Sequence, residues 1–279
     1  MEWTNTKAQT LLEALKEGFP DSSTNSLRSW IKDVRVTVSR KPATQSNQIV
    51  QPGQKIALGK RKLYMEEGIE ILYEDDHMIA LYKPAGILSV ATDYDITYNV
   101  HSFLKKRFNR RRVYPVHRLD REASGVMVFA YSDKAQYELK KQFEDHSILR
   151  QYLAIVEGDL QPTQGTWQTY LLEDGAYYVR SVSDPERGEL ATTHYKVIKR
   201  FKNTSTLLVT LETGKKNQIR VHCKEAGHSI LGDKKYGSTL EQAGRIALHA
   251  FKLGIEHPIL KKPMTFEKAA PPEFNKYLP

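Results

Sequence analysis

The strongest constraint on the fold of this chain is an apolar run, Val126–Ala130, that directly follows a highly charged loop. Together with the small-residue turn Ala123–Gly125 before it, this run predicts a buried strand. The loop carries Asp120, flanked by Arg118 and Arg121. Nearby positive charge favours the ionised carboxylate, so the stretch suits a site that needs an anionic Asp beside a rigid strand. An exposed turn in which Asp120 only pairs with an arginine explains the same residues equally well.

Length and composition set the broad class of the protein. With 279 residues, the chain can form one large domain or a main domain with a small one. Hydrophobic residues make up 40% and charged residues 27%, as in an ordinary soluble globular protein. No apolar run approaches the ~18 residues of a membrane span, and the first residues lack a signal-peptide pattern. A single cysteine, Cys223, excludes an internal disulfide and a cysteine-ligated zinc site, so we expect a cytoplasmic protein with no membrane association.

An excess of basic residues points to a polyanionic partner. The net charge is +9, from 42 Lys and Arg against 33 Asp and Glu. The first 62 residues hold 11 of these basic residues and only 5 acidic ones, so most of the excess lies near the N-terminus. Nucleic acid is the commonest partner for such a distribution. A basic surface without a partner is the alternative.

The first 60 residues have the pattern of a small α+β domain. Apolar spacing and alternation predict two helices and two strands, at residues 8–19, 26–32, 34–38 and 49–58. A short basic linker, residues 59–62, follows them. We therefore expect one domain over residues 1–60 and a second, larger one over residues 61–279.

The order of these elements resembles an S4 RNA-binding domain. Two short helices precede a Val-x-Val strand and a Val-x-Pro-Gly-x-x-Ile tail. In the S4 family, the second helix and the loop after it lie on RNA backbone. The resemblance therefore implies phosphate contacts by the basic residues of this region, which are Arg28, Lys32, Arg35, Arg40 and Lys41. A small domain that only packs on the main one is the alternative.

Strand-like and helical segments alternate in the larger domain. Acidic turn residues separate two apolar strands in a predicted hairpin over residues 69–86, which ends in a Pro-Ala-Gly turn. Further helices are predicted at residues 100–108, 132–145 and 217–226. Further strands are predicted at residues 150–158, 176–180, 191–198 and 206–211. The rest of residues 163–200 is polar and irregular in pattern.

The densest positive charge follows the first of these helices. Six of the eight residues over 105–112 are cationic, and Phe108 lies among them. Clustered Lys and Arg follow phosphates, and an aromatic ring can stack on an unpaired base. Because the run leads straight into the Asp120 loop, we expect it to contact a nucleic acid beside that loop. Its basic residues are Lys105, Lys106, Arg107, Arg110, Arg111 and Arg112.

Several familiar motifs do not occur in this sequence. It contains neither of the glycine-rich phosphate-binding motifs of nucleotide enzymes. It also lacks a His-Glu-x-x-His zinc motif and a Gly-x-Ser-x-Gly nucleophile elbow. His222 is best explained as a core histidine whose ring nitrogens are satisfied. We therefore expect neither a cofactor nor a metal.

Five motifs, spread over residues 69–260, closely resemble those of the RluA-type pseudouridine synthase family. They are His117-Arg118-Leu119-Asp120 with Ser124-Gly125, Arg150-x-Tyr152-x-Ala154-x-Val156-x-Gly158, Leu211-x-Thr213-Gly214-Lys215-x-x-Gln218-Ile219-Arg220-x-His222, Gly227-x-x-Ile230-Leu231-Gly232-Asp233-x-x-Tyr236-Gly237, and Leu248-His249-Ala250. The resemblance implies an α+β catalytic fold whose mixed, mainly antiparallel central sheet is flanked by helices. It also implies an isomerase that detaches uracil from C1′ of a uridine, turns it and rejoins it through C5.

The resemblance also implies roles for individual residues. Asp120 is expected to be the essential carboxylate, acting as a nucleophile or as a base on the sugar. Arg220 is expected to pair with Asp120 and keep it ionised. Tyr152 is expected to stack on the uracil and relay a proton. Since the target base must leave the RNA stack, Arg118 is a candidate to fill the space it vacates. Further predicted RNA contacts are Arg121, Lys215 and Gln218.

Two alternatives from other functional classes remain at this point. A catalytically idle RNA-binding protein would share the basic charge, and a base-removing hydrolase could use the same Asp. RNA is the expected partner, with large-subunit ribosomal RNA favoured over tRNA, and no obligate protein partner is evident.

Overall fold

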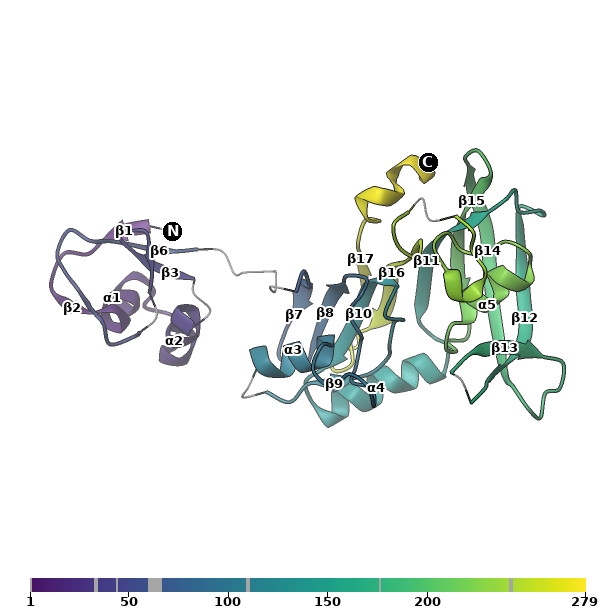
Figure 1. The fold of residues 1–279 in the computed structure, drawn as a ribbon. Coiled ribbons are helices and arrows are strands. Elements are labelled where there is room, and N and C mark those ends of the chain that lie inside the picture. The colour runs from purple at the N-terminus through teal and green to yellow at the C-terminus, as the bar shows by residue number, and fades with distance from the viewer. Residues whose placement is uncertain are drawn as a thin grey trace. The chain divides into compact units, whose positions relative to one another are not determined.

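The computed structural model describes residues 2–32, 35–43, 45–59, 67–108, 111–175, 177–240 and 243–279. The chain divides into two compact units, Met1–Met65 and Glu66–Pro279, which are drawn in Figure 1. Each unit has its own hydrophobic core. In the described part of the chain, no helix has the length and apolarity needed to span a bilayer.

The first unit packs two helices against a small antiparallel sheet (Figure 1). The sheet has the order β1-β6-β3-β4, with β1 at Glu2–Thr4, β3 at Val36–Val38, β4 at Lys41–Pro42 and β6 at Lys55–Leu58. A short separate ladder joins β2, Gln9–Thr10, to β5, Ile49–Val50. The helices are α1, Leu11–Gly18, and α2, Thr24–Lys32. Leu11, Leu15 and Leu27 are fully buried between these elements.

Local signals account for the shape of this unit. Thr10 and Glu13 form a reciprocal capping box that starts α1 three residues later than the sequence predicted. Val36 and Val38 are buried, as the predicted alternation required, whereas residue 34 of that predicted strand lies outside the described residues. Ser39 and Arg40 both have positive φ, at 49° and 67°, and form the two-residue turn between β3 and β4.

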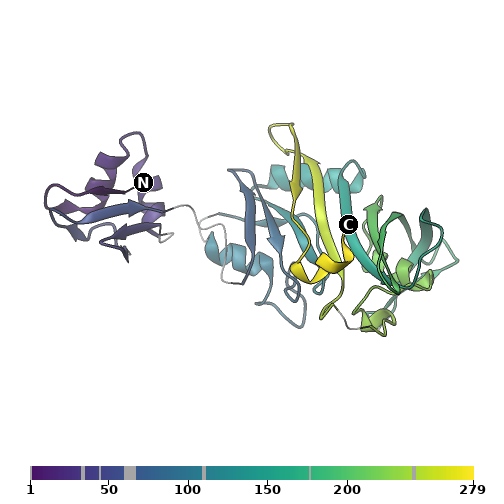
Figure 2. The same cartoon turned by 90° about the horizontal axis from the view of Figure 1, so that it is seen from above.

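The second unit is built on an 11-stranded sheet with the order β13-β12-β14-β15-β11-β16-β10-β8-β7 (Figures 1 and 2). Strand β17 pairs with β16, and β9 pairs with β10. The β10–β16 pair is parallel, and the other strand pairs that the described residues form are antiparallel. The strands are β7 Glu70–Glu74, β8 Met78–Lys83, β9 Tyr114–Pro115, β10 Ser124–Ala130, β11 Leu149–Glu157, β12 Gln164–Glu173, β13 Val179–Val182, β14 Glu189–Arg200, β15 Thr204–Leu211, β16 Leu248–Glu256 and β17 Pro263–Glu267.

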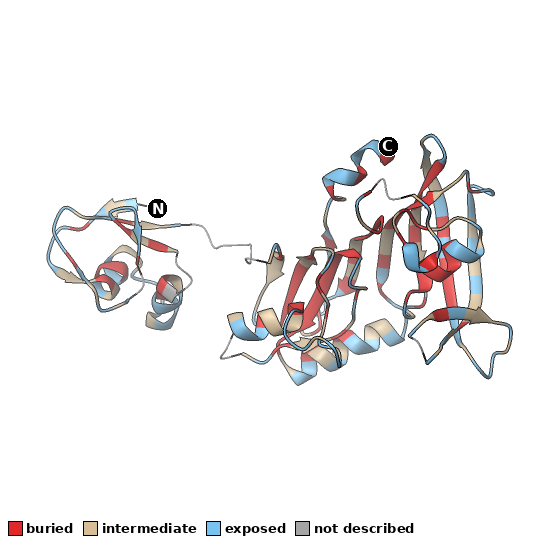
Figure 3. Ribbon diagram, in the orientation of Figure 1, coloured by how far each residue is buried: buried red, intermediate tan, exposed pale blue. Residues whose placement is uncertain are grey.

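Helices cover both faces of the β7–β10 part of this sheet. These helices are α3 Val100–Arg107 and α4 Asp133–Glu144. The third helix, α5 Gln218–Glu225, lies against β13 and β14, and the 3-10 turns are η1 Lys234–Tyr236 and η2 Pro272–Tyr277. On β10, Val126 and Val128 pack with α4 in one cluster, whereas Phe129 stacks on His101 of α3. Figure 3 shows β10 buried along its length, which explains its continuous apolar sequence. The predicted fold, a mixed and mainly antiparallel sheet flanked by helices, is confirmed.

One long strand was missed by the sequence analysis. Strand β12 occupies part of the segment that read as polar and irregular, and its residues are mostly exposed or half-buried. Its ladder with β14 runs from Gln164 to Leu171, so backbone pairing rather than burial maintains it. The predicted strand at residues 176–180 is β13, which begins at Val179, and residue 176 lies outside the described residues.

Candidate active site

The Asp120 loop is fixed to the sheet by the two residues at the start of β10. Ser124 is buried, and its hydroxyl lies 2.9 Å from Nδ1 of His249 on β16. Gly125 has a φ of +139°, and a Cβ at this position would lie 2.3 Å from the carbonyl oxygen of Ala250. A side chain at residue 125 would therefore break the parallel pairing of β10 with β16. The Ser-Gly pair of the motif is thus explained by the anchoring of the loop.

Both sides of Asp120 are also tied to the turn after β8. The Ser89 hydroxyl donates to the Leu119 carbonyl at 2.8 Å and accepts from the Leu119 amide at 2.9 Å. Lys83, which is fully buried, donates from Nζ to the carbonyls of Ile87, Pro84 and Arg121 at 2.8, 3.0 and 3.3 Å. Burial lowers the pKa of Lys83 to about 7, and the charge of Asp120 opposes this shift. These hydrogen bonds hold the backbone on both sides of Asp120 in place.

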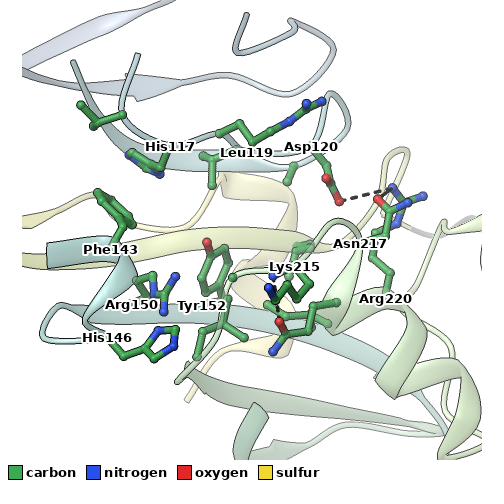
Figure 4. A pocket seen from close by; sticks show the side chains of 18 of the residues that line it. His117, Leu119, Asp120, Phe143, His146, Arg150, Tyr152, Lys215, Asn217 and Arg220 are labelled. Carbon is green, nitrogen blue, oxygen red and sulfur yellow. Dashed lines mark hydrogen bonds and ion pairs between the residues drawn. The ribbon is translucent and has the colours of Figure 1, made fainter. Parts of the chain in front are cut away.

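Arg220 on α5 supplies the positive charge closest to Asp120 (Figure 4). Its Nη1 lies 3.4 Å from Oδ2 of Asp120, 3.5 Å from Oε2 of Glu122 and 3.1 Å from Oδ1 of Asn217. Its Nε and Nη2 donate to the buried Asp233 at 2.7 and 2.8 Å. Burial opposes the charge on Arg220, but the hydrogen bonds and charge of Asp233 outweigh it and raise the pKa of Arg220. Arg220 therefore remains a fixed cation beside Asp120.

The net electrostatic effect on Asp120 differs from the sequence-based expectation. Burial raises the pKa of the Asp120 carboxyl, Arg220 opposes the rise, Glu122 adds to it, and Arg118 opposes it further. The net direction is upward: the arginines favour the ionised form, as expected, but they do not outweigh the burial of the carboxyl. The reason is that Arg118 is exposed and Arg121 donates to the Gly86 carbonyl at 3.1 Å, while the loss of water around Asp120 dominates.

A cavity of about 570 Å³ opens beside the Asp120–Arg220 contact. Figure 4 shows the Tyr152 ring standing in this cavity, with its hydroxyl turned toward the loop that carries Leu119 and Asp120. Burial raises the pKa of Tyr152 to about 12, so its phenol is neutral near pH 7. The structure therefore brings the three predicted catalytic residues, Asp120, Tyr152 and Arg220, to one cavity. Arg118, Lys215 and Gln218 line it as well.

Arg150 lies two residues before Tyr152 on β11 and lines the same cavity. The sequence analysis gave it no role. Its Nη2 donates to the Glu212 carbonyl at 2.5 Å, and its guanidinium lies 5.9 Å from the Phe143 ring centroid. A Cβ at Gly214 would lie 2.4 Å from Arg150 Nη1. A side chain at the glycine of the Thr-Gly-Lys motif would therefore displace the end of the Arg150 side chain from its place beside the Glu212 carbonyl.

The described residues contain no group of three or more His, Cys, Asp and Glu side chains placed to hold a metal ion. The polar side chains that line the cavity include the Asp120 carboxylate, the Tyr152 phenol and the guanidinium groups of Arg118, Arg150 and Arg220. Comparison of the sequence with known proteins identifies the family of the chain. Residues 77–225 match the family model described as RNA pseudouridylate synthase. The chain belongs to the RNA pseudouridylate synthase family.

Curated relatives of this synthase agree with the family match. It is 37% identical over 225 residues to ribosomal large subunit pseudouridine synthase D of Zymomonas mobilis, covering 74% of this chain and 71% of that protein. It is also 37% identical over 210 residues to dual-specificity RNA pseudouridine synthase RluA of Pasteurella multocida, covering 74% of this chain and 94% of that one. The predicted enzyme class, an RNA pseudouridine synthase of the RluA type, is confirmed.

Solved structures share the fold of the catalytic unit. Human RNA pseudouridylate synthase domain containing 4 superposes with a TM-score of 0.62 at 22% identity, covering 74% of this chain and 92% of that one. Human RNA pseudouridylate synthase domain containing 1 gives a TM-score of 0.61 at 23% identity, covering 74% of this chain and 84% of that one. At these identities the likeness concerns the fold alone.

The basic run of the synthase does not lie beside Asp120, contrary to the expectation from its sequence position. After this run the chain returns along β10, so that Tyr114 pairs with Ala130 and Pro115 with Phe129. The run thus lies at the Ala130 end of β10, while Asp120 precedes the Ser124 end, about 20 Å away at ~3.3 Å per residue. Arg111 is engaged there with the Asp75 carbonyl and the Asp76 carboxylate, at 3.0 and 3.1 Å.

The other basic residues of this run are described only in part. Lys105, Lys106 and Arg112 are exposed, Arg107 is half-buried, and residue 110 lies outside the described residues. In the first unit, Arg28, Arg40 and Lys41 are exposed, and Arg35 donates to the Gly59 carbonyl at 3.3 Å. Nothing is described of the Lys32 side chain. Their contacts with RNA stay predictions.

The predicted RNA contact of Gln218 conflicts with its surroundings. Its Oε1 accepts from the Thr213 hydroxyl and the Lys215 amide, both at 2.9 Å. Its Nε2 donates to the Thr192 carbonyl and the Thr193 hydroxyl at 3.0 and 2.9 Å. These four bonds use the whole hydrogen-bonding capacity of the amide. Gln218 therefore holds the loop before α5 in place, and its amide has no group left for RNA.

Three polar residues of the site were missed by the sequence analysis. Glu122 is an acidic neighbour of Asp120 that the analysis passed over, and Asp233 was quoted in a motif without a role. Lys83, which lies within the predicted hairpin over residues 69–86, was given no role. The signal for Lys83 was its position at the end of an apolar strand, where a buried lysine needs several acceptors.

Proposed function

We propose that this RNA pseudouridine synthase acts on large-subunit ribosomal RNA and that Asp120 is its essential carboxylate. The observation that carries the catalytic assignment is the 3.4 Å contact of Asp120 with Arg220 at the wall of the cavity. The name of the Zymomonas mobilis relative favours the ribosomal target, and the dual-specificity relative makes tRNA the second candidate.

In the proposed reaction, the C1′–N1 bond of the target uridine breaks and a C1′–C5 bond forms. The C5 hydrogen is released to water, and N1 gains a proton. Asp120 assists bond cleavage as a nucleophile or as a base on the sugar, and Arg220 stabilises its ionised form. Tyr152 stacks on the uracil and relays a proton, and with its pKa raised to about 12 it enters the reaction as the neutral phenol. Arg118, exposed at the rim, stacks in the space that the flipped base vacates.

Replacement of Asp120 by Asn tests the catalytic assignment. We expect Asp120→Asn to abolish tritium release from RNA labelled at C5 of uridine while RNA binding is retained. Glu122→Gln is the matched control, because it removes the neighbouring carboxylate and should retain turnover. Turnover by Asp120→Asn would refute the assignment of Asp120.

Pseudouridine mapping in total RNA tests the target. Cells that lack the gene should lose one or a few pseudouridines from large-subunit ribosomal RNA and regain them with the wild-type gene. The Asp120→Asn gene should fail to restore them. Losses confined to tRNA would replace the ribosomal target by the second candidate.

We also propose that residues 1–60, within the first unit, form an S4-like RNA-binding domain that contacts phosphates through Arg28, Lys32, Arg35, Arg40 and Lys41. Its excess positive charge supports this role. Deletion of these 60 residues should weaken RNA binding and flatten the dependence of affinity on salt, since fewer counterions are released. An unchanged salt slope would show that the unit makes no phosphate contacts.

A further inference from the structure

Exposed apolar side chains gather on one loop of the catalytic unit. Among the described residues, nine large hydrophobic side chains are exposed, and three of them lie on one five-residue segment. Tyr94, Ile96 and Tyr98 are 83%, 70% and 48% exposed. A fourth, Tyr177 on the turn between β12 and β13, is 52% exposed and contacts Tyr94. Such clustering of apolar surface marks an interaction site more often than chance exposure does.

The backbone of the first loop is ordered to present these side chains. A bridge between Leu88 and Asn99 closes the loop at its base. Asp95 accepts hydrogen bonds from the amides of Thr97 and Tyr98 at 3.2 and 2.9 Å, and its own amide donates to the Thr92 hydroxyl at 3.2 Å. The exposed aromatic residues are therefore carried by a folded loop, so little ordering is needed when they bind a partner.

The second segment holds its aromatic residue in an unusual conformation. Tyr177 has a φ of +58°, a backbone conformation that residues other than glycine rarely adopt. The rings of Tyr94 and Tyr177 meet edge to face, with centroids 6.2 Å apart and an interplanar angle of 86°. At 83% exposure, most of the Tyr94 side chain remains accessible to solvent in this arrangement.

The charge around this pair suits a nucleic acid. The amines of Lys216 and Lys224 lie 5.2 and 5.5 Å from the ring centroids of Tyr177 and Tyr178. Lys235 donates to the Tyr177 carbonyl at 2.9 Å. Acidic residues are present as well: Asp93 and Asp95 on the loop, Asp174 on the turn of Tyr177, and Glu173, which is hydrogen-bonded to Lys216. Lysines interleaved with aromatic rings favour single-stranded RNA over an apolar protein surface.

Both aromatic residues are attached to the walls of the active site. The loop of Tyr94 begins at Ser89, which bonds to Leu119, the neighbour of Asp120. The lysine over Tyr177, Lys216, lies between Lys215 and Asn217, which both line the cavity. Bases that stack on this pair therefore belong to nucleotides near the target uridine.

We propose that Tyr94 and Tyr177 form a stacking platform for unpaired bases that flank the target uridine, with Lys216 contacting their phosphates. This inference deepens the proposed function and rests on RNA as the substrate. It predicts that the synthase prefers targets whose neighbouring nucleotides are unpaired, because bases within a duplex are not free to stack on the rings.

Binding of an oligocytidylate of about 12 nucleotides to the full-length chain tests the platform, since this probe contains no uridine to react. Tyr94→Ala and Tyr177→Ala should each raise Kd between about 5-fold and about 100-fold, without changing the salt slope. Tyr94→Phe, which keeps the ring, should bind like the wild type. Tyr137→Ala is the matched control, because Tyr137 is 65% exposed on α4, away from the platform. Lys216→Gln should lower the salt slope by about one.

Two results would overturn the platform. The first is wild-type affinity of Tyr94→Ala and Tyr177→Ala, whether or not their melting temperatures fall. The second is an equal loss of affinity for a duplex of the same length, which would show that the rings contact backbone. Photocrosslinking with 5-iodocytidine in the probe gives an independent answer, and crosslinks at Tyr94 or Tyr177 are expected. These outcomes are separate from the ribosomal target, which only the mapping of pseudouridines tests.

Discussion

Arg220 presents only its Nη1 edge to Asp120, at 3.4 Å, because Asp233 occupies its Nε and Nη2 at 2.7 and 2.8 Å. The shorter and doubly bonded pair is therefore the structural one, and the longer contact is the one that faces the cavity. Asp233 fixes the orientation of the guanidinium, while the contact with Asp120 can be exchanged during a reaction. Loss of the Asp233 carboxylate should therefore affect stability as well as activity, whereas loss of the Asp120 carboxylate should mainly affect activity.

The first prediction concerns Asp233. Asp233→Asn leaves the buried Arg220 without its main counter-charge, so the free energy of unfolding should fall by about 3–5 kcal/mol. The kcat for tritium release should fall by roughly 100-fold, because Nη1 is no longer aimed at Asp120. Urea unfolding followed at Trp167, with Trp3 and Trp30 replaced by Phe, reports on the catalytic unit.

Glu122→Gln, at a half-exposed carboxylate, should change the free energy of unfolding by less than about 1 kcal/mol. Equal effects of both changes would contradict the special position of Asp233.

The second prediction concerns the pH dependence of activity. Since burial raises the pKa of Asp120, activity that requires the ionised carboxylate should fall as the pH decreases through that raised value. Glu122 adds to the rise, so Glu122→Gln should lower the pKa and move the acid limb of the kcat/KM profile to lower pH. An acid limb that stays in place, or moves to higher pH, would show that Glu122 does not act on the ionisation of Asp120.

The same shift has a consequence for stability. A raised pKa means that the folded chain binds a proton at Asp120 more tightly than the unfolded chain does. The free energy of unfolding should therefore decrease as the pH rises through the interval between the two pKa values. Asp120→Asn removes this effect and should be more stable than the wild type at neutral pH. Urea midpoints of the two proteins should converge as the pH approaches the unfolded pKa of about 3.9.

The fourth prediction concerns Lys83, whose ammonium joins the carbonyls of Pro84, Ile87 and Arg121. Lys83→Met leaves these buried acceptors without a donor, which should lower the free energy of unfolding by at least about 2 kcal/mol. Because one carbonyl belongs to the neighbour of Asp120, kcat should also fall, by about tenfold for a small displacement of the loop. Lys134→Met, at an exposed position of α4, should alter neither quantity. A stable and fully active Lys83→Met would contradict the anchoring role.

Sequence patterns predicted the type and bounds of an element correctly where its buried residues recur with the period of a helix or form a continuous apolar run. The buried run of β10 and the amphipathic α4, which Ser132 caps, have the expected type and nearly the expected bounds. Strand β12 was missed because its residues are largely exposed, so the pattern of burial that reveals other strands does not exist there.

The site shows the limits of sequence reasoning more clearly. The resemblance to the family motifs predicted that Asp120, Tyr152 and Arg220 share a site. The two hydrogen bonds from Arg220 to Asp233 could not be predicted, because the spacing of residues in the sequence does not give the orientation of a side chain. The direction of the pKa shift of Asp120 depends on burial, which sequence neighbours do not report. The basic run was misplaced relative to the site because the segment after it returns along the length of β10.

The last prediction concerns two buried histidines, His222 and His249. Burial lowers the pKa of each to about 4, and both ring nitrogens of each lie 2.9 Å from protein hydrogen-bonding partners. Between about pH 6.5, the unfolded pKa, and pH 4, the unfolded chain binds more protons than the folded chain. Each histidine should therefore contribute a decrease in the free energy of unfolding of about 1.4 kcal/mol per pH unit as the pH falls through this interval, opposite in sign to the contribution of Asp120.

Urea unfolding between about pH 7 and about pH 5 measures this slope, with Trp167 as the probe because its ring lies 6.2 Å from that of His222. His222→Gln should reduce the slope by the share of one histidine, since glutamine can bond to the same threonines without titrating. An equal slope in His222→Gln and the wild type would mean that His222 is not forced to be neutral in the folded protein, and that its burial carries no penalty for protonation.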